Sequence, residues 1–157
     1  MTPGSTKKAM VYRFEREPIA GFVDSANPFH LEGIQLLNRE GVIQNLPLLQ
    51  IKSLCFVREW LDGLAWSRSQ YTVRPRQQGL WVKVQFRDGD ILEATMPNSI
   101  AALDPVALSI SPPDAASGVQ RVLIPRLALE SFEVLGVVGS SLRRKLGPAS
   151  NQLKMFD

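Results

Sequence analysis

An internal repeat constrains the fold of this chain more than any other feature of its sequence. The segment MVYRFEREPIAGFVD (10–24) resembles VKVQFRDGDILEATM (82–96) when the two are aligned at an offset of 72 residues. This alignment places Phe14 on Phe86. Self-similarity over a stretch of this length predicts that one structural unit occurs twice.

The match continues toward the end of each copy. The same offset aligns Ile34 with Val106, and LPLLQIKSLCFV (46–57) then aligns with IPRLALESFEVL (124–135) at an offset of 78. The change of offset falls in SPPDAASG (111–118), whose proline, glycine and serine content is typical of a loop. Because loops accept insertions, the change supports the alignment.

Each copy has the pattern of short β-strands. Over residues 82–87, apolar and polar side chains alternate, which is the period of a half-buried strand. Asp88-Gly89 follows at once and predicts a two-residue hairpin with a type I′ turn, in which both central residues have positive φ. Four more strands are expected in the second copy, and the first copy repeats the order. Phe14 and Phe86 should then occupy matching core positions.

Five short strands in about 50–60 residues, with no helical period, favour a small barrel. The prediction is an all-β chain with tandem five-stranded barrels at 8–57 and 80–139, a Trp/Arg-rich basic linker at 58–79 and a flexible basic tail at 140–157. Because a unit of this size buries little apolar surface by itself, the two barrels are expected to pack together.

Equivalent prolines mark the end of the fourth expected strand in each copy. Pro47 and Pro125 predict a bend at this point, because proline cannot donate to a strand ladder. With this kink, and with an opening strand that runs into an Asp-Gly turn in VKVQFRDGDIL, the pattern resembles the Sm-like and SH3-like barrel superfamily over about residues 8–138. It looks closer still to an uncharacterised bacterial family with two such units.

The resemblance implies a binding protein. Sm-like proteins that bind uridine-rich RNA use a polar cluster after the second strand and an Arg-Gly pair between the fourth and fifth. The polar cluster is matched here by Asp24, Ser25 and Asn27, or by Asn98 and Ser99 in the second copy. Neither kink contains an Arg-Gly pair.

Arginine and aromatic residues are interleaved in and around the linker, and those that make it a candidate nucleic-acid contact are Arg58, Trp60, Trp66, Arg68, Arg74 and Arg76. Single-stranded nucleic acid is bound by such residues through phosphate contacts and base stacking. The alternative, which we favour, is that the tryptophans cover the joint between the barrels under the arginine stems.

The charge is distributed unevenly along the chain. The two folded copies, 10–57 and 80–139, hold eight Lys/Arg and twelve Asp/Glu, whereas the rest of the chain holds ten Lys/Arg and three Asp/Glu.

The C-terminal tail carries a short motif. It resembles the peptide Gln-Leu-x-Leu-Phe, by which bacterial replication and repair proteins dock on the DNA sliding clamp, with methionine in place of the second leucine. The anchors presented to a preformed pocket would be Gln152, Leu153, Met155 and Phe156. A chance match, or a tail that packs on the barrels, is the alternative.

No set of residues in the sequence supports catalysis, a metal or a cofactor. His30 is the only histidine, and Cys55 lies in an apolar strand, where a thiol is usually inert packing. One histidine and one cysteine cannot supply the four ligands of a structural zinc site. The acidic turn at 88–90, with Glu93 nearby, lacks the spacing of a calcium loop and indicates a hairpin turn with solvated carboxylates. We therefore expect a non-enzymatic chain without a cofactor.

Location and partners are predicted from composition. No apolar run approaches the roughly 20 residues of a membrane-spanning helix, and the N-terminus MTPGSTKKAM is not a secretory signal. A single cysteine fits the reducing cytoplasm best. The expectation is a cytoplasmic adaptor that binds a protein partner, such as the sliding clamp, through its barrel edges and tail. The alternative is an Sm-like protein that binds single-stranded RNA or DNA, and homo-oligomers through the barrel edges stay open.

Overall fold

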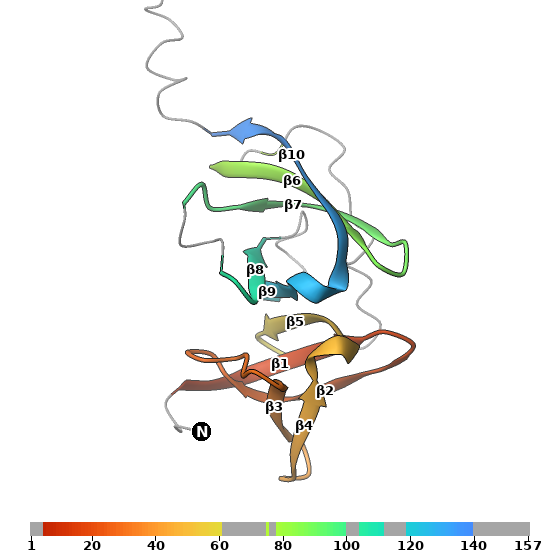
Figure 1. Cartoon of the computed structure of the whole chain (residues 1–157). Helices are drawn as coiled ribbons and strands as arrows, with labels where there is room; N and C mark the ends of the chain where they lie inside the picture. Colours follow the sequence, from red (N-terminus) through yellow and green to blue (C-terminus); the bar gives the residue numbers. More distant parts are fainter. Residues whose placement is uncertain (1–4, 61–74, 76–77, 100–103, 112–118, 140–157) are drawn as a thin grey trace, which may run out of the picture.

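The computed structural model describes residues 5–60, 75, 78–99, 104–111 and 119–139 (Figure 1). The first half contains β1 (Thr6–Arg13), β2 (Arg16–Asp24), β3 (Gly33–Asn38), β4 (Ile43–Pro47), the 3₁₀ helix η2 (Leu48–Gln50) and β5 (Ile51–Val57). The second contains β6 (Gly79–Phe86), β7 (Ile91–Met96), β8 (Ala107–Ile110), β9 (Val119–Pro125), η6 (Arg126–Ala128) and β10 (Leu129–Val138). The protein is all-β, as predicted.

The strands form one sheet of seven, in the order β4-β3-β2-β1-β5-β9-β8, and one of three, in the order β10-β6-β7. The sequence predicts two five-stranded barrels that pack together, whereas in the structure neither sheet is a closed barrel and the larger sheet takes strands from both halves. The two halves join where β5 pairs with β9, through Leu54 opposite Leu123 and Cys55 opposite Val122. In Figure 1 the three-stranded sheet lies on one side of β8 and β9, and the strands of the first half lie on the other.

The order of neighbouring strands is the same in each half. The first half runs β5-β1-β2-β3-β4 within the larger sheet. The second half runs β10-β6-β7 and then β8-β9, and a bridge between Thr95 and Ser111 connects β7 to β8. Two backbone hydrogen bonds form this bridge, from Thr95 N to Ser111 O (2.9 Å) and from Ser111 N to Thr95 O (2.8 Å). The repeat seen in the sequence is therefore also a repeat of strand order.

Strand pairing fixes which residues of the two halves are equivalent. Val11 lies opposite Leu54 on β5, and Val84 lies opposite Phe132 on β10. Because Leu54 and Phe132 are 78 residues apart, Val11 corresponds to Val84, at an offset of 73. In the third strand of each half, Ile34 opposite Leu46 corresponds to Leu108 opposite Ile124, an offset of 74.

The predicted equivalence of Phe14 and Phe86 is wrong by one residue. Phe14 N donates to Gln50 O, and the corresponding bond in the second half runs from Arg87 N to Ala128 O, both at 2.9 Å. Phe14 is therefore the counterpart of Arg87. Phe86 is fully buried, whereas Phe14 packs against the same cluster from the first half and is only partly buried. A shift of one residue along a strand moves a side chain to the opposite face, so two identical residues misled the alignment.

Two apolar clusters form the core and meet at β5. One belongs to the first half with a single residue of the second, and consists of Ala9, Val11, Val23, Ile34, Leu36, Leu46, Ile51, Leu54, Phe56 and Leu123. The other is built mainly from the second half, including Val82, Val84 and Phe86, with the first-half residues Met10, Cys55 and Val57. Every residue of β5 is buried, because its two faces serve different clusters. The predicted alternation along β6 is confirmed.

Two sequence signals can be compared directly with the backbone. Pro47 and Pro125 end β4 and β9, and a 3₁₀ helix follows each, so the predicted bend is confirmed. The turn after β6 differs from the prediction, since Gly89 has a φ of 96° but Asp88 does not have positive φ. Gly89 N bonds Phe86 O, and Phe86 N bonds Asp90 O. This is a type I turn followed by a left-handed glycine, the other common hairpin solution for an Asp-Gly pair.

Candidate interaction surface

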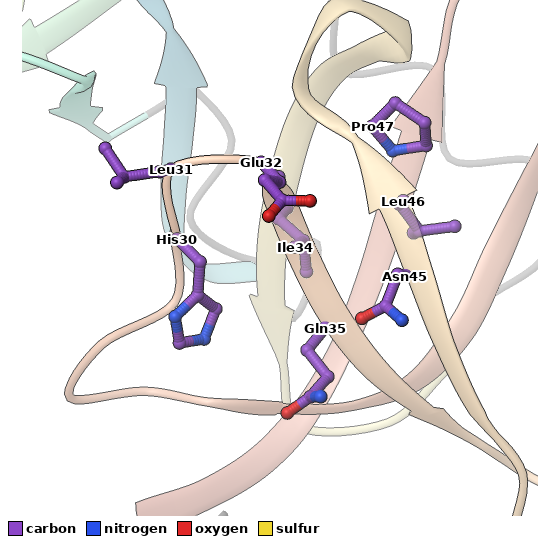
Figure 2. Close-up of a pocket in the computed structure, with 9 residues that line it drawn as sticks. His30, Leu31, Glu32, Ile34, Gln35, Asn45, Leu46 and Pro47 are labelled. Carbon is purple, nitrogen blue, oxygen red and sulfur yellow. The ribbon is translucent and has the colours of Figure 1, made fainter.

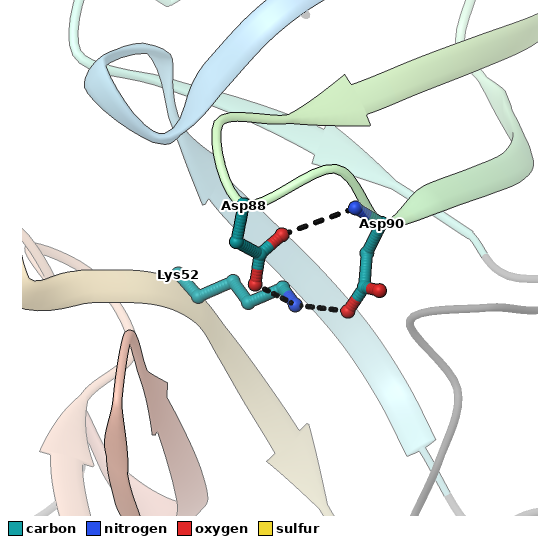
Figure 3. Close-up of polar contacts among 3 residues, drawn as sticks. All are labelled: Lys52, Asp88 and Asp90. Carbon is teal, nitrogen blue, oxygen red and sulfur yellow. Dashed lines mark hydrogen bonds and ion pairs between the residues drawn. The ribbon is translucent and has the colours of Figure 1, made fainter.

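An ion-pair cluster joins the two halves at the acidic turn. Lys52 Nζ on β5 lies 2.8 Å from Asp88 Oδ2 and 2.5 Å from Asp90 Oδ2 (Figure 3). Lys52 is buried, and its ammonium also lies 5.0 Å from the centre of the Phe86 ring. The predicted hairpin turn is present and Asp88 is exposed, but Asp90 is only 20% exposed and both carboxylates balance a buried cation from the other half, which the prediction of solvated carboxylates did not include. Among the described residues, no group of three or more His, Cys, Asp and Glu is placed to hold a metal.

Arg87 makes a second contact between the halves. Its guanidinium donates to Leu127 O at 3.2 Å and to Leu49 O, so it bridges the two 3₁₀ helices. The same group lies 4.0 Å from the centre of the Phe14 ring. Together with the ion pairs of Lys52, these contacts show that the acidic turn of the second half connects the two halves.

Trp60 is the predicted linker aromatic that the structure describes. Its Nε1 lies 3.2 Å from both Ala9 O and Gly21 O, to which it donates, and its ring meets Phe22 edge-on at 5.1 Å. Two cations, Lys8 and Arg39, lie 5.0 and 4.9 Å from the ring. The indole N–H is thus occupied by the backbone of β1 and β2, and the ring packs, partly buried, against the core cluster that contains Met10 and Val57.

The other predicted contact residues are placed as follows. Arg58 is exposed at the end of β5. Trp66, Arg68, Arg74 and Arg76 lie outside the described residues, as do the tail anchors Gln152, Leu153, Met155 and Phe156. For these eight residues the nucleic-acid and clamp interpretations stay predictions.

The structure does not bring the histidine and the cysteine together as a reactive pair. Burial raises the pKa of the Cys55 thiol well above its ordinary value, although a hydrogen bond with Ser53 acts in the opposite direction. A thiol in this state is protonated at neutral pH and is a poor nucleophile. Cys55 is fully buried in the core, whereas His30 is exposed at a surface groove.

Four strands end the two sheets in the described part of the chain, and two of them, β7 and β8, are connected to each other by the bridge between Thr95 and Ser111. β4 pairs only with β3, and β10 pairs only with β6. Exposed apolar side chains lie at both edges. Val42 and Ile43 are 56% and 55% exposed beside β4, and Phe132 and Val134 are 39% and 48% exposed on β10. An unpaired strand with apolar side chains is a template for pairing with another chain.

A groove lies beside the β4 edge. It has a volume of about 750 Å³ and is lined by residues 30–35 and 45–47 (Figure 2). Gln35 and Asn45 lie opposite each other on β3 and β4 and give it a polar floor, and Leu31 at its rim is 98% exposed. The sequence predicted barrel edges as a working surface but did not select these residues. For β10, the repeat alignment contained a usable signal. It matched Phe132 with the core residue Leu54, and so marked Phe132 as an apolar side chain that needs a cover.

The fold and these surfaces define an all-β protein of two interlocked repeats with open edges and, in its described residues, no assembled catalytic or metal centre. Over residues 5–136 the chain matches the model of a family of unknown function (DUF6982), and it belongs to that family. Searches of curated proteins and of solved structures gave no match. No helix in the described part of the chain is long and apolar enough to cross a membrane.

Proposed function

We propose that this chain is a non-enzymatic adaptor that binds protein partners by strand addition at its open edges. The observation that carries the proposal is β10, a ten-residue strand that pairs only with β6 among the described residues and that exposes Phe132 and Val134. In strand addition, main-chain hydrogen bonds supply affinity and side chains on alternate positions supply specificity. β10 offers both kinds of contact.

Each half is proposed to be a small barrel unit of the Sm-like or SH3-like kind. The support is the shared strand order and the proline followed by a 3₁₀ helix between the fourth and fifth strands of each half. A unit of this kind leaves its fourth and fifth strands available at the edges, which is the surface that the adaptor role requires.

The tail is proposed as a second docking element, directed at the bacterial sliding clamp. The support is the sequence alone, in which Gln152, Leu153, Met155 and Phe156 match the clamp-binding pattern. Such an adaptor would connect whatever binds its edges to the clamp. The two elements are separable, because a peptide of the tail and the body of the protein can be tested independently.

The test of the edge proposal is affinity capture with the full chain and one pair of variants. Val134→Lys places a charge on the exposed apolar face of β10, whereas Ser131→Lys places the same charge on the opposite face of the same strand. We expect a specific protein captured by the wild type, at salt high enough to suppress charge-driven binding, to be lost by Val134→Lys and kept by Ser131→Lys. Equal capture by all three proteins would refute the edge proposal.

A further inference from the structure

The junction between the halves shows what kind of strand fits these edges. There, β5 pairs antiparallel with β9, with Leu54 opposite Leu123 and Phe56 opposite Arg121. Leu123 belongs to the core cluster of the first half, although it comes from the second. The β9 strand therefore supplies both main-chain pairing and an apolar cover for the neighbouring half.

Because the chain is a repeat, the β5–β9 junction has an equivalent pair of strands, and these two strands do not pair with each other within a single chain. The counterpart of β5 is β10, and the counterpart of β9 is β4, each at an offset of 78 residues. Among the four end strands of the two sheets, these are the two that no bridge connects to a further strand in the described residues. Each copy of the chain thus carries both partners of a β5–β9 type junction, one at either end.

Transferring the register of the junction predicts which residues would meet. Phe132 of one copy would lie opposite Asn45 of the next, and Val134 opposite Ile43. Residues opposite each other in an antiparallel pair share a face. The pair of Phe132 and Asn45 corresponds to Leu54 and Leu123, and the pair of Val134 and Ile43 corresponds to Phe56 and Arg121. The apolar contact in the new junction would therefore be that of Ile43 with Val134, and these two side chains and Phe132, all exposed in the single chain, would leave water together.

The groove beside β4 also has a counterpart inside the molecule. A hollow of about 240 Å³ on β8 and β9 is walled on one side by Ala26, Asn27, Pro28 and Phe29 of the first half, and on the other by second-half residues that include Val106, Ala107, Ser109 and Leu123. Their counterparts in the repeat are Glu32, Gly33, Gln35 and Asn45, all of which line the open groove of about 750 Å³. The backbone bonds Leu48 N to Glu32 O and Arg126 N to Val106 O confirm this correspondence. The open groove is therefore the counterpart of a surface that, on β8 and β9, the other half covers within the chain.

We propose that the partner at these edges is a second copy of this chain, which docks head to tail by pairing its β10 with β4 of the first. The inference rests on the proposed function, since it names the occupant of the same edges. The contact is heterologous, because each copy uses one surface as donor and a different one as acceptor. Repetition of such a contact gives a ring if the rotation closes and a filament if it does not.

Sedimentation of the full chain over a range of concentrations tests the assembly. We expect the wild type to grow beyond its monomer mass of 17.4 kDa as concentration rises. Ile43→Lys blocks the β4 edge and Val134→Lys blocks the β10 edge, and each variant alone should associate at least about tenfold more weakly. An equimolar mixture of the two should form a heterodimer and nothing larger, because one intact β10 and one intact β4 are still present.

A cysteine pair tests the register. Ile43→Cys in one copy and Val134→Cys in another should form an intermolecular disulfide in a mild redox buffer, because directly opposite Cβ atoms are within reach of one. Ile43→Cys with Ser131→Cys is the control and should crosslink far less. Cys55 does not compete, because it is buried.

Three outcomes would overturn the inference: a wild type that stays monomeric at high micromolar concentration, variants that associate as the wild type does, or a mixture with no heterodimer. The last would indicate a symmetric contact between like edges. If the wild type is monomeric while Val134→Lys still loses a captured protein, the second copy is excluded and the adaptor proposal stands. If Val134→Lys changes neither measurement, both fail.

Discussion

Replacing Phe86 with alanine tests how the second half is packed. Its ring is fully buried in the cluster that also contains Val82 and Val84, and it faces the Lys52 ammonium at 5.0 Å. Truncation of a buried phenylalanine removes its transfer free energy and leaves a cavity, at a cost of about 3–5 kcal/mol. A chain of this size loses about 2–4 °C in Tm per kcal/mol, so we expect a decrease of about 6–20 °C.

Two other variants make the measurement specific. Phe14→Ala removes the same ring from the position that the sequence alignment placed on Phe86, but Phe14 is only partly buried, so its loss should be about 1–2 kcal/mol. Lys83→Ala lies on the opposite face of β6 and should change stability by less than about 0.5 kcal/mol. Urea unfolding with a constant m-value gives the three free energies of unfolding. Equal losses at Phe14 and Phe86 would refute the assignment of equivalent positions, and a large loss at Lys83 would mean that the faces of β6 are reversed.

Three further predictions concern the backbone, the buried thiol and the tail. Gly33→Ala should destabilise the protein far more than Gly41→Ala in thermal melts: both glycines have positive φ, but a Cβ on Gly33 would meet Leu46 O at 1.8 Å, while one on Gly41 meets nothing within 4 Å. Because burial raises the pKa of Cys55, its contribution to stability is complete below the unfolded pKa of about 8.5 and falls above it, by up to about 1.4 kcal/mol per pH unit; unfolding of Cys55→Ala should lack this loss between pH 8 and 10. A peptide of residues 147–157 should bind the bacterial sliding clamp with modest affinity and lose binding on Phe156→Ala, as measured by calorimetry, and the absence of binding at high micromolar peptide would refute the clamp proposal.

The features that sequence could predict are those determined locally. The alternation over residues 82–87 specified a strand with Phe86 inside, because a two-residue period needs no knowledge of partners. Pro47 and Pro125 specified the ends of β4 and β9, because proline acts through its own missing N–H. The expectation of two similar halves came from the similarity of two sequence segments, and this comparison also needs no knowledge of how the segments pack.

The features that sequence missed depend on contacts between distant residues. Nothing in the pattern of 51–57 states that β5 will pair with β9, since an apolar strand buried on both faces reads the same whatever covers it. The charges at Asp88 and Asp90 were read as solvated because Lys52 lies far away in sequence. The choice of turn at Asp88-Gly89 also escaped, because the same dipeptide suits two hairpin geometries.

The position of β5 between two cores has a consequence for how the protein is made. On the ribosome, the first half emerges first, with Met10, Cys55 and Val57 forming an apolar surface that only the second half covers. The strand that contains Leu54 is paired on both sides only after Leu123 has been synthesised and β9 has paired with β5. Closing so long a loop slows folding, and the exposed strand is open to wrong partners in the meantime. We therefore expect the nascent first half to be the stage of synthesis at which uncovered apolar side chains make wrong pairing and aggregation easiest.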